Sequence, residues 1–204
     1  MRDADFFRRW MAAAAASVER EADRLTELDS PIGDADHGSN LRRGFAAVAA
    51  ALEAEPVSAA PGPVLQLAGR TLISTVGGAS GPLYGTLLRR TGKALGASAE
   101  VSDAELRAAL SEGVGAVAQL GGAVPGDKTM LDALEPGVAA LGTSYRAAAS
   151  AAENGALATV PMRARKGRAS YLGERSVGHQ DPGATSSALL LAALADVAES
   201  ADAR

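Results

Sequence analysis

The chain has 204 residues, of which 47% are hydrophobic but only 3% aromatic, and its formal net charge is −4. This length suits one domain, and the acidic balance argues against a nucleic-acid binder, which normally carries a positive face. The sequence contains no cysteine, so disulfides, thiolate chemistry and zinc–thiolate sites are excluded. We find no signal peptide and no long lipid-soluble segment. We therefore expect a single domain over 1–204 that is cytoplasmic and has no membrane or nucleic-acid partner.

Helical periodicity dominates the first half of the chain. Apolar residues recur every three or four positions, which predicts helices over 7–28, 41–52 and 64–76. A proline- and alanine-rich link, Pro56–Pro63, precedes the third helix, and Gly77-Gly78 is a plausible left-handed terminator after it. Ser80 as N-cap, with Pro82 in the first turn, predicts a fourth helix that continues towards Leu95.

The second half of the chain adds further helices between charged, glycine-rich loops. Ser102 and Glu105 form a predicted capping box before the fifth helix, and Gly121–Asp127 reads as a loop. Further helices are predicted over 129–134, from Pro136 to about residue 152, over 156–165, and from Pro182 to residue 198, with a long loop over 167–183. These are about eight helices without convincing two-residue alternation. The predicted fold is therefore an all-α bundle in which alternate loops share an end.

Three carboxylates crowd at the start of the second predicted helix: Asp29, Asp34 and Asp36. Residues two apart point the same way in an extended segment, and Asp29 can fold back from the end of the first helix. Clustered carboxylates repel unless cations lie between them, and oxygen ligands suit Mg²⁺. An EF-hand is excluded, because counting from Asp34 puts Ser39 where glycine is needed and Phe45 where glutamate is needed. The alternative is that Asp36 caps the helix and the other two are solvated.

Three predicted helices begin with glycine-containing segments suited to anions: Asp36–Asn40, Ser80-Gly81-Pro82 and Asp181-Pro182-Gly183. Unpaired amides and the helix dipole favour phosphate at such N-termini, and Gly38 would let a bulky anion approach the backbone. Capping explains each segment singly, but the three together with the aspartates favour a phosphate ligand with metal. A Walker loop is excluded, because the segment GAVPGDKT has the wrong glycine spacing and an aspartate in place of lysine.

The remaining polar candidates are His37 and a group of cations. His37 lies beside two of the aspartates, where it can hydrogen-bond a phosphate; otherwise it is a surface histidine at a helix start. The cations are either a solvated charge run or a group that neutralises phosphates or docks to an acidic partner; they are Lys128, Arg165, Lys166, Arg168 and Arg175. Met130 and Leu83 are core residues unless a flat adenine ring packs on them.

Four segments in order resemble the nucleotide-binding L subunits of dihydroxyacetone kinases: IGDADHGSNLRRGF, GGASGPLYGTLL, PGDKTMLDAL and KGRASYLGERSVGHQDPGATSS. The resemblance covers about Leu28–Ser187, most of the chain. It implies an eight-helix, up-and-down, barrel-like bundle with the nucleotide, ADP or ATP, at one end. It also implies two Mg²⁺ ions that join the nucleotide phosphates to Asp29, Asp34 and Asp36.

The same resemblance implies which residues contact the nucleotide, and it gives Arg168 a catalytic role in neutralising the charge that develops during phosphoryl transfer. The implied nucleotide contacts are His37, Gly38, Ser39, Asn40, Ala79, Ser80, Gly121, Met130, Arg168, Asp181, Pro182 and Gly183.

The family has a single-chain branch that uses ATP and a branch of separate subunits in which bound ADP is rephosphorylated in place. A chain that ends at Arg204 resembles the second branch. The implied partners are a K subunit that holds dihydroxyacetone, a phosphoprotein of the sugar phosphotransferase system as phosphoryl donor, and a second copy in a homodimer. The alternatives are the ATP-binding subunit of a kinase for another acceptor, a non-catalytic nucleotide-loaded regulatory module, and a helical scaffold whose aspartates are caps.

Overall fold

The computed structural model describes residues 1–55 and 60–202, and over this part the regular elements are almost all helices. The strands β1 (Arg2–Asp3) and β2 (Glu100–Val101) form one short antiparallel pair. The helices are α1 (Ala4–Asp29), α2 (His37–Ala54), α3 (Pro61–Thr75), α4 (Ser80–Leu95), α5 (Asp103–Gly121), α6 (Leu131–Ala140), α7 (Tyr145–Ala158), the 3₁₀-helix η1 (Arg168–Ser176) and α8 (Pro182–Asp202). The prediction of an all-α fold is confirmed. The predicted link Pro56–Pro63 lies outside the described residues as far as residue 59.

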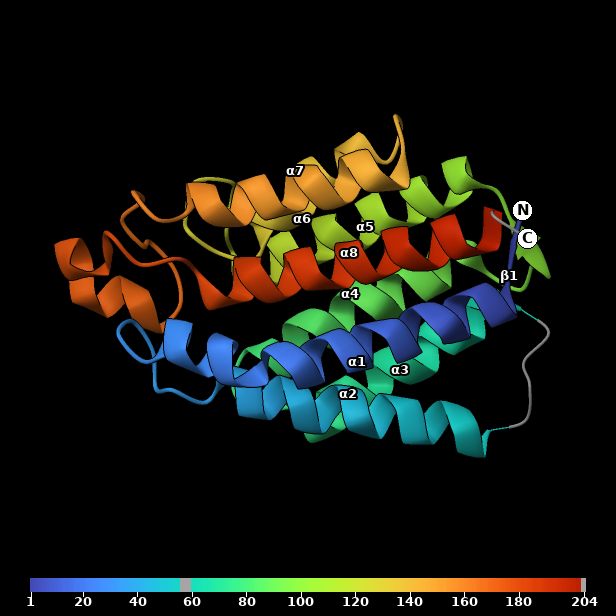
Figure 1. Cartoon of the computed structure of the whole chain (residues 1–204), viewed down its shortest axis with the longest axis horizontal. Helices are drawn as coiled ribbons and strands as arrows, with labels where there is room; N and C mark the ends of the chain where they lie inside the picture. The colour runs from blue at the N-terminus through green and yellow to red at the C-terminus, as the bar shows by residue number, and fades with distance from the viewer. Residues whose placement is uncertain (56–59, 203–204) are drawn as a thin grey trace.

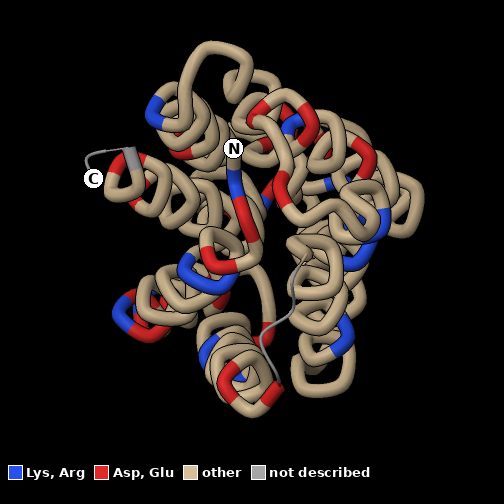
Figure 2. The backbone as a smooth tube through the Cα atoms, turned by 90° about the vertical axis from the view of Figure 1, so that its right-hand side faces the viewer, with Lys and Arg blue, Asp and Glu red and all other residues tan. Residues whose placement is uncertain are grey.

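The α-helices close into a barrel-like bundle in chain order. Each helix from α1 to α7 packs against the next one, and α8 packs against both α7 and α1. The N-terminus and β1 lie at one end of the bundle, whereas η1 and the loop between α1 and α2 lie at the opposite end (Figure 1). Figure 2 views the bundle from the end that holds the N-terminus, with helices seen nearly end-on. The up-and-down course thus gathers alternate loops at one end, as predicted.

One apolar cluster, built largely from small side chains, fills the bundle. The apolar side of the first helix is buried: Phe7 and Met11, which belong to the predicted pattern, and the neighbouring Trp10 are each 0% exposed. The indole Nε1 of Trp10 donates to the Leu190 carbonyl at 2.9 Å and so joins α1 to α8. Within the described residues, Pro182–Ala201 is long and apolar enough to cross a membrane, but 67% of its most apolar window is buried. The apolar character of α8 therefore serves the core.

The predicted helix start at Pro136 is wrong. α6 runs through Pro136 and ends at Ala140. α7 begins after it and is capped by Ser144, whose hydroxyl accepts the Ala147 amide at 3.0 Å. Proline lacks the N–H that would bond the carbonyl four residues earlier, that of Asp132. This carbonyl lies against Gly155 of α7, where an added Cβ would be 2.0 Å from it. The packing of α6 on α7 therefore outweighs the local tendency of proline to start a helix.

Three neighbouring predictions also need correction. The predicted helix over 156–165 is not formed: α7 ends at Ala158 and a turn follows through Pro161, since the residue before a proline disfavours helical backbone. The predicted loop over 167–183 contains η1. Ser80 is the first residue of α4, with Ala79 at the N-cap, and its hydroxyl lies 3.3 Å from Nδ1 of His37. The end of α7 thus follows from a local proline, whereas Ser80 has a tertiary partner in place of a capping role.

α3 and α4 approach each other closely through facing glycines. A Cβ added to Gly69 would lie 2.6 Å from the Gly85 carbonyl oxygen, and a Cβ added to Gly85 would lie 2.7 Å from the Gly69 carbonyl oxygen. Neither backbone can retreat without disturbing the packed pair of helices. Gly115 on α5 is a contrast, because its Cβ position has open space among the described residues.

We expect Gly69→Ala to lower the free energy of unfolding by about 1–3 kcal/mol, the usual cost of overpacking a close contact. Gly115→Ala is the matched control and should raise it by about 0.5–1 kcal/mol, because alanine is the better helix former. Urea unfolding followed by circular dichroism measures both. Equal stabilisation by the two substitutions would contradict the close approach of α3 and α4.

Candidate functional site

A cavity of about 290 Å³ opens at the end of the bundle opposite the N-terminus. It lies where α1 ends, where α2, α4 and α8 begin, and where η1 crosses from outside. The structure brings these predicted site residues together in its lining: Asp29, Asp34, Asp36, His37, Ala79, Ser80, Gly121, Met130, Arg168, Asp181, Pro182 and Gly183. Residues from both halves of the chain therefore meet at one place.

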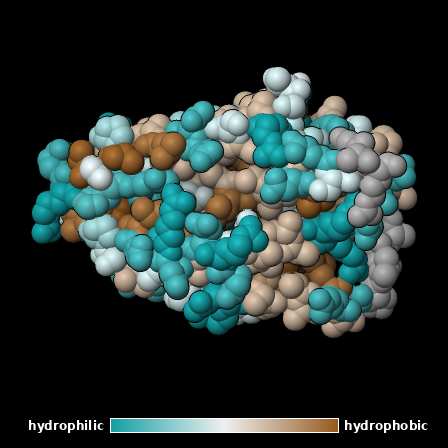
Figure 3. Space-filling view, in the orientation of Figure 1, coloured by the Kyte–Doolittle hydropathy of each residue, from teal (hydrophilic) through white to brown (hydrophobic). Residues whose placement is uncertain are grey.

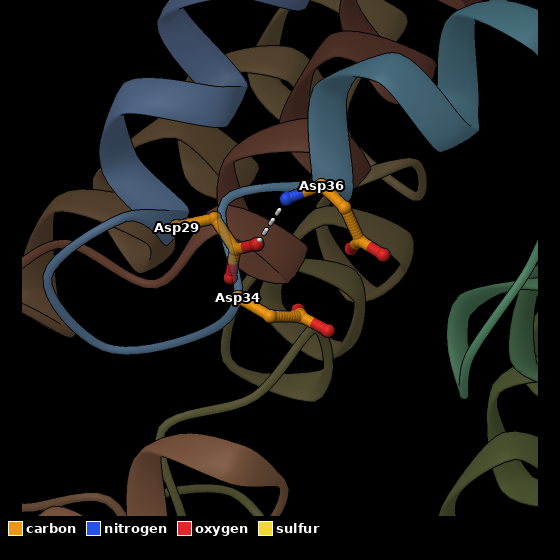
Figure 4. A group of neighbouring side chains, drawn as sticks. All are labelled: Asp29, Asp34 and Asp36. Carbon is orange, nitrogen blue, oxygen red and sulfur yellow. Dashed lines mark hydrogen bonds between the residues drawn. The ribbon is translucent and has the colours of Figure 1, made fainter.

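The three aspartates form one cluster at this cavity (Figure 4). Asp29 is the last residue of α1, Asp34 lies in the following loop, and Asp36 immediately precedes α2. One carboxylate oxygen from each of the three lies within 4.8 Å of the other two. Asp29 is buried, whereas the other two reach the surface of the cavity. The cluster is thus anchored on one side and open on the other.

Asp29 organises the cluster through the backbone of α2. Its Oδ2 accepts the amides of Asp36 at 3.0 Å and His37 at 3.2 Å. Asp36 occupies the N-cap position, yet its side chain makes no capping bond to any described residue. The helix start is capped by Asp29, which leaves the Asp36 carboxylate available. Gly33 makes the arrangement possible, because a Cβ there would lie 1.9 Å from Oδ1 of Asp29.

The donor set fits a divalent cation such as Mg²⁺. Three carboxylates this close repel one another unless positive charge lies among them, and Mg²⁺ prefers a few carboxylate oxygens together with water and phosphate oxygens. Arg168 supplies part of that charge, since its Nη2 lies 2.8 Å from Oδ2 of Asp34. The Arg168 side chain is 68% exposed, so solvent weakens this ion pair. The cluster can therefore exchange the guanidinium for a metal ion at small cost.

Three helix N-termini converge on the cavity. His37 begins α2, Ser80 begins α4 and Pro182 begins α8, and all three residues line the cavity. The first amides of a helix have no partner within the helix, and the dipole places partial positive charge there. Three such ends facing one space make it suited to a ligand with several phosphate oxygens.

A buried chain of hydrogen bonds fixes His37 in the cavity wall. Its Nε2 shares a hydrogen bond of 2.9 Å with the Ser186 hydroxyl, which in turn shares one of 2.6 Å with the hydroxyl of Tyr84. Burial lowers the pKa of His37, against the opposing effect of the nearby aspartates, and burial raises the pKa of Tyr84 to about 12. His37 is thus held with Nδ1 turned towards Ser80. Sequence reasoning missed Tyr84 and Ser186, because neither lies in a segment with polar periodicity.

One wall of the cavity is apolar. It is formed by Leu83, Val117, Ala123, Met130 and Leu131. Ligand pockets commonly combine such a wall with a few directed polar groups, and a flat aromatic ring is the shape that fits between aliphatic side chains. The cavity therefore offers distinct subsites for charged and for apolar parts of one ligand.

Three predicted site residues lie outside the lining, among the residues that the structure describes: Gly38, Ser39 and Asn40. They form the first turn of α2. A Cβ on Gly38 would lie 1.8 Å from the Ala22 carbonyl oxygen, so the glycine allows α2 to approach α1. The missing side chain of Gly38 thus has a packing role, and the expectation that the glycine also opens the backbone to an anion stays a prediction.

Lys128 is the cavity residue whose place differs most from expectation. Sequence reasoning grouped it with a cluster of loop cations, but it is only 1% exposed and lines the cavity. Its Nζ donates to the carbonyls of Met162 at 3.0 Å and Ser176 at 2.6 Å. Its backbone is left-handed, with φ of 63°. A single lysine in a glycine-containing loop carries no periodic signal, so the sequence alone could not show its burial.

Asp181 is a buried acid on the inner side of the cavity. Its Oδ2 accepts the Ala184 amide at 2.7 Å and caps α8. Burial raises the pKa of Asp181 to about 7 from its ordinary value of 3.8, and this outweighs the opposing effect of the hydrogen bond from Ala184. The folded protein therefore binds a proton at Asp181 more tightly than the unfolded chain does.

This raised pKa makes stability depend on pH with a definite sign. The contribution of Asp181 is fully present below about pH 4 and is lost as the pH rises to about 7. Without metal or nucleotide, we expect the free energy of unfolding to fall more steeply from pH 5 to 8 in the wild type than in Asp181→Asn. Asparagine keeps an acceptor for the Ala184 amide but does not ionise. Urea unfolding at several pH values would contradict this if the two curves ran parallel.

Comparison with known proteins shows which family the chain resembles. Residues 31–196 match the DAK2 domain. The chain is 45% identical to the ADP-binding subunit DhaL of the PEP-dependent dihydroxyacetone kinase of Escherichia coli K12, over 91% of this chain and 93% of that protein. It is 40% identical to the D-erythrulose kinase of Mycolicibacterium smegmatis over 91% of this chain, but spans only 33% of that longer protein.

A solved structure supports the same assignment. The dihydroxyacetone kinase of C. freundii in complex with AMP-PNP and Mg²⁺ superimposes with a TM-score of 0.71 and 28% identity, over 92% of this chain and 33% of that chain. Sequence and fold therefore agree, and the chain belongs to the DAK2 domain family.

Proposed function

We propose that this protein is the ADP-binding subunit of a PEP-dependent dihydroxyacetone kinase. In this proposal it holds ADP or ATP with two Mg²⁺ ions and passes a phosphoryl group to dihydroxyacetone on a separate K subunit. The observation that carries the proposal is that the acidic cluster at the start of α2 lines one cavity together with the starts of α4 and α8. The 45% identity to a subunit of that name supports it.

Asp29, Asp34 and Asp36 are the residues that would hold the metal ions. When bound, Mg²⁺ supplies charge neutralisation at the bridging and terminal phosphate oxygens, which is the main demand of phosphoryl transfer. The first turn of α2 (His37, Gly38, Ser39 and Asn40), the start of α4 (Ala79 and Ser80) and the start of α8 (Asp181, Pro182 and Gly183) would bind the phosphates at the positive ends of the three helix dipoles. Gly121, Met130 and the apolar wall would receive the adenine ring.

Arg168 is the group of this chain that we place nearest the transferred phosphoryl. It lies on η1, outside the bundle, and reaches inwards to Asp34. Because this ion pair is exposed to solvent, the guanidinium can turn from the Asp34 carboxylate to phosphoryl oxygens. A guanidinium forms paired hydrogen bonds with such oxygens. Its contribution is to stabilise negative charge in the transition state, without a covalent step on the protein.

The acceptor and the donor would both be supplied by other subunits. The acceptor is held by the K subunit, and the donor is a phosphoprotein of the sugar phosphotransferase system that rephosphorylates bound ADP. A second candidate function is phosphorylation of a tetrulose sugar, which the 40% identity to a D-erythrulose kinase favours.

We expect Asp34→Ala to weaken the binding of ADP in the presence of Mg²⁺ by at least about tenfold. Loss of a residue that only orients a metal ligand already lowers metal affinity by about 10- to 100-fold, and Asp34 would be a ligand itself. Asp23→Ala, at an exposed position on α1, is the control and should bind normally. Isothermal titration with and without chelator measures the effect. Retention of full Mg²⁺-dependent affinity by Asp34→Ala would remove the metal role of the cluster.

We expect the purified chain alone to give negligible turnover with ATP and dihydroxyacetone. In this proposal its cavity holds the nucleotide and the metal ions, and the acceptor is bound on the K subunit. Adding a dihydroxyacetone-loaded K subunit should restore phosphoryl transfer, and a coupled assay with dihydroxyacetone or erythrulose then distinguishes the two acceptors. Robust activity of the chain without a partner would contradict the separate-subunit proposal.

A further inference from the structure

The segment 162–176, here called the arm, carries the cation that faces the acidic cluster. It leaves the bundle after α7, contains η1 and returns before α8 (Figure 1). Arg168 and Lys166 of the arm line the cavity from outside. The end of the molecule formed by the arm is largely hydrophilic on the face shown in Figure 3.

The apolar contacts that the arm does make are separate from the main core. Ala164, Ala169 and the partly buried Leu172 form a small cluster with Ile32, which belongs to the loop that carries Asp34. A cluster of this size buries little area and cannot by itself fix the arm. Its position must depend on the polar contacts at its base.

Lys128 provides the principal contact at that base. Its ammonium group donates to the carbonyls of Met162 and Ser176, the first and last residues of the arm, at 3.0 Å and 2.6 Å. Next to it, the Asp127 carbonyl accepts the Arg165 amide at 3.0 Å. Hydrogen bonds from a buried cation are stronger than neutral ones, so this side chain closes the arm into a fixed loop.

The backbone at Lys128 also favours a role for the side chain. A φ of 63° lies in the left-handed region, where a residue with a Cβ costs roughly 1 kcal/mol relative to glycine. Glycine or asparagine would relieve this strain but could not reach the two carbonyls. The turn is itself rigid, because the Asp132 carboxylate accepts the amides of Gly126 and Thr129 at 2.5 Å and 2.7 Å.

We propose that Lys128 is a positioning residue for phosphoryl transfer, which fixes both ends of the arm and thereby sets where Arg168 stands over the acidic cluster. The inference rests on the proposed function. The same turn leads directly into Met130 on the cavity wall, so Lys128 joins the nucleotide side of the cavity to the arm. Arg168 is itself 68% exposed, and its place therefore follows that of the arm.

The first test is the turnover of Lys128→Met in the complex with the K subunit and donor. The isosteric side chain keeps the packing but loses the two hydrogen bonds. We expect kcat to fall by about 10- to 100-fold, the effect of a displacement of about 1 Å in a reacting arrangement. Affinity for Mg²⁺ and ADP should change by less than about threefold, because the aspartates are untouched. Lys93→Met, at an exposed position on α4, should leave both unchanged.

A double-substitution cycle separates positioning from a merely structural role. If Lys128 acts through Arg168, then Lys128→Met combined with Arg168→Ala should be no slower than Arg168→Ala alone, within about twofold. Losses that multiply, or an unchanged kcat in Lys128→Met, would overturn the proposal.

Hydrogen exchange tests the arm without any need for kinase activity. In Lys128→Met the amides over 162–176 should exchange at least about tenfold faster, while those over 186–196 of α8 are unaffected. Unchanged exchange in the arm would overturn the proposal even if wild-type turnover is normal. Faster exchange with an inactive wild type would instead contradict the proposed function alone.

A milder variant covers the case in which Lys128→Met does not fold. Ser176→Ala removes the hydroxyl that accepts the Ala164 amide at 2.9 Å, a further contact across the base of the arm. Like Lys128→Met, it should make the amides of the arm exchange faster and should lower kcat. If it does neither, the arm is not held at its base and the proposal fails.

Discussion

The carboxylate of Asp29 joins two helix ends, and the site depends on this contact. A negative charge at the C-terminus of α1 is disfavoured by the dipole of its own helix. The two amides that Asp29 accepts belong to the N-terminus of α2, whose dipole has the opposite effect on the same charge. One buried carboxylate therefore ties the ends of consecutive helices and brings the loop with Asp34 and the Asp36 side chain alongside.

This arrangement stores electrostatic repulsion that a ligand can relieve. Three carboxylates lie within 4.8 Å of one another, and one of them, that of Asp34, forms an ion pair with the exposed Arg168. The helix starts across the cavity favour anions while the cluster favours cations, so the two sides attract opposite parts of a metal–phosphate complex. Neither side alone selects for such a complex, because capping and solvation account for each separately. Their meeting at one cavity is the reason that we propose a nucleotide with Mg²⁺ as the ligand.

Local signals account for what could be predicted from the sequence. Helical spacing gave the order of the helices, and the Ser102–Glu105 capping box is present with both of its hydrogen bonds. The acidic cluster could be predicted because its three members lie within eight residues of the sequence. The helical course through Pro136 and the burial of Lys128 could not be predicted from nearby residues. α6 is held by α7, and the carbonyls bound by Lys128 lie 34 and 48 residues away. A contact with a residue far along the chain cannot be predicted from the residues next to it in the sequence.

The most direct measurement is a crystal structure of the protein with Mn²⁺ in place of Mg²⁺ and with ADP, using the anomalous signal of the metal. The account predicts anomalous density between Asp29, Asp34 and Asp36, with the diphosphate directed at the starts of α2, α4 and α8. Density for ADP without metal at the three aspartates, or metal bound elsewhere in the molecule, would contradict it.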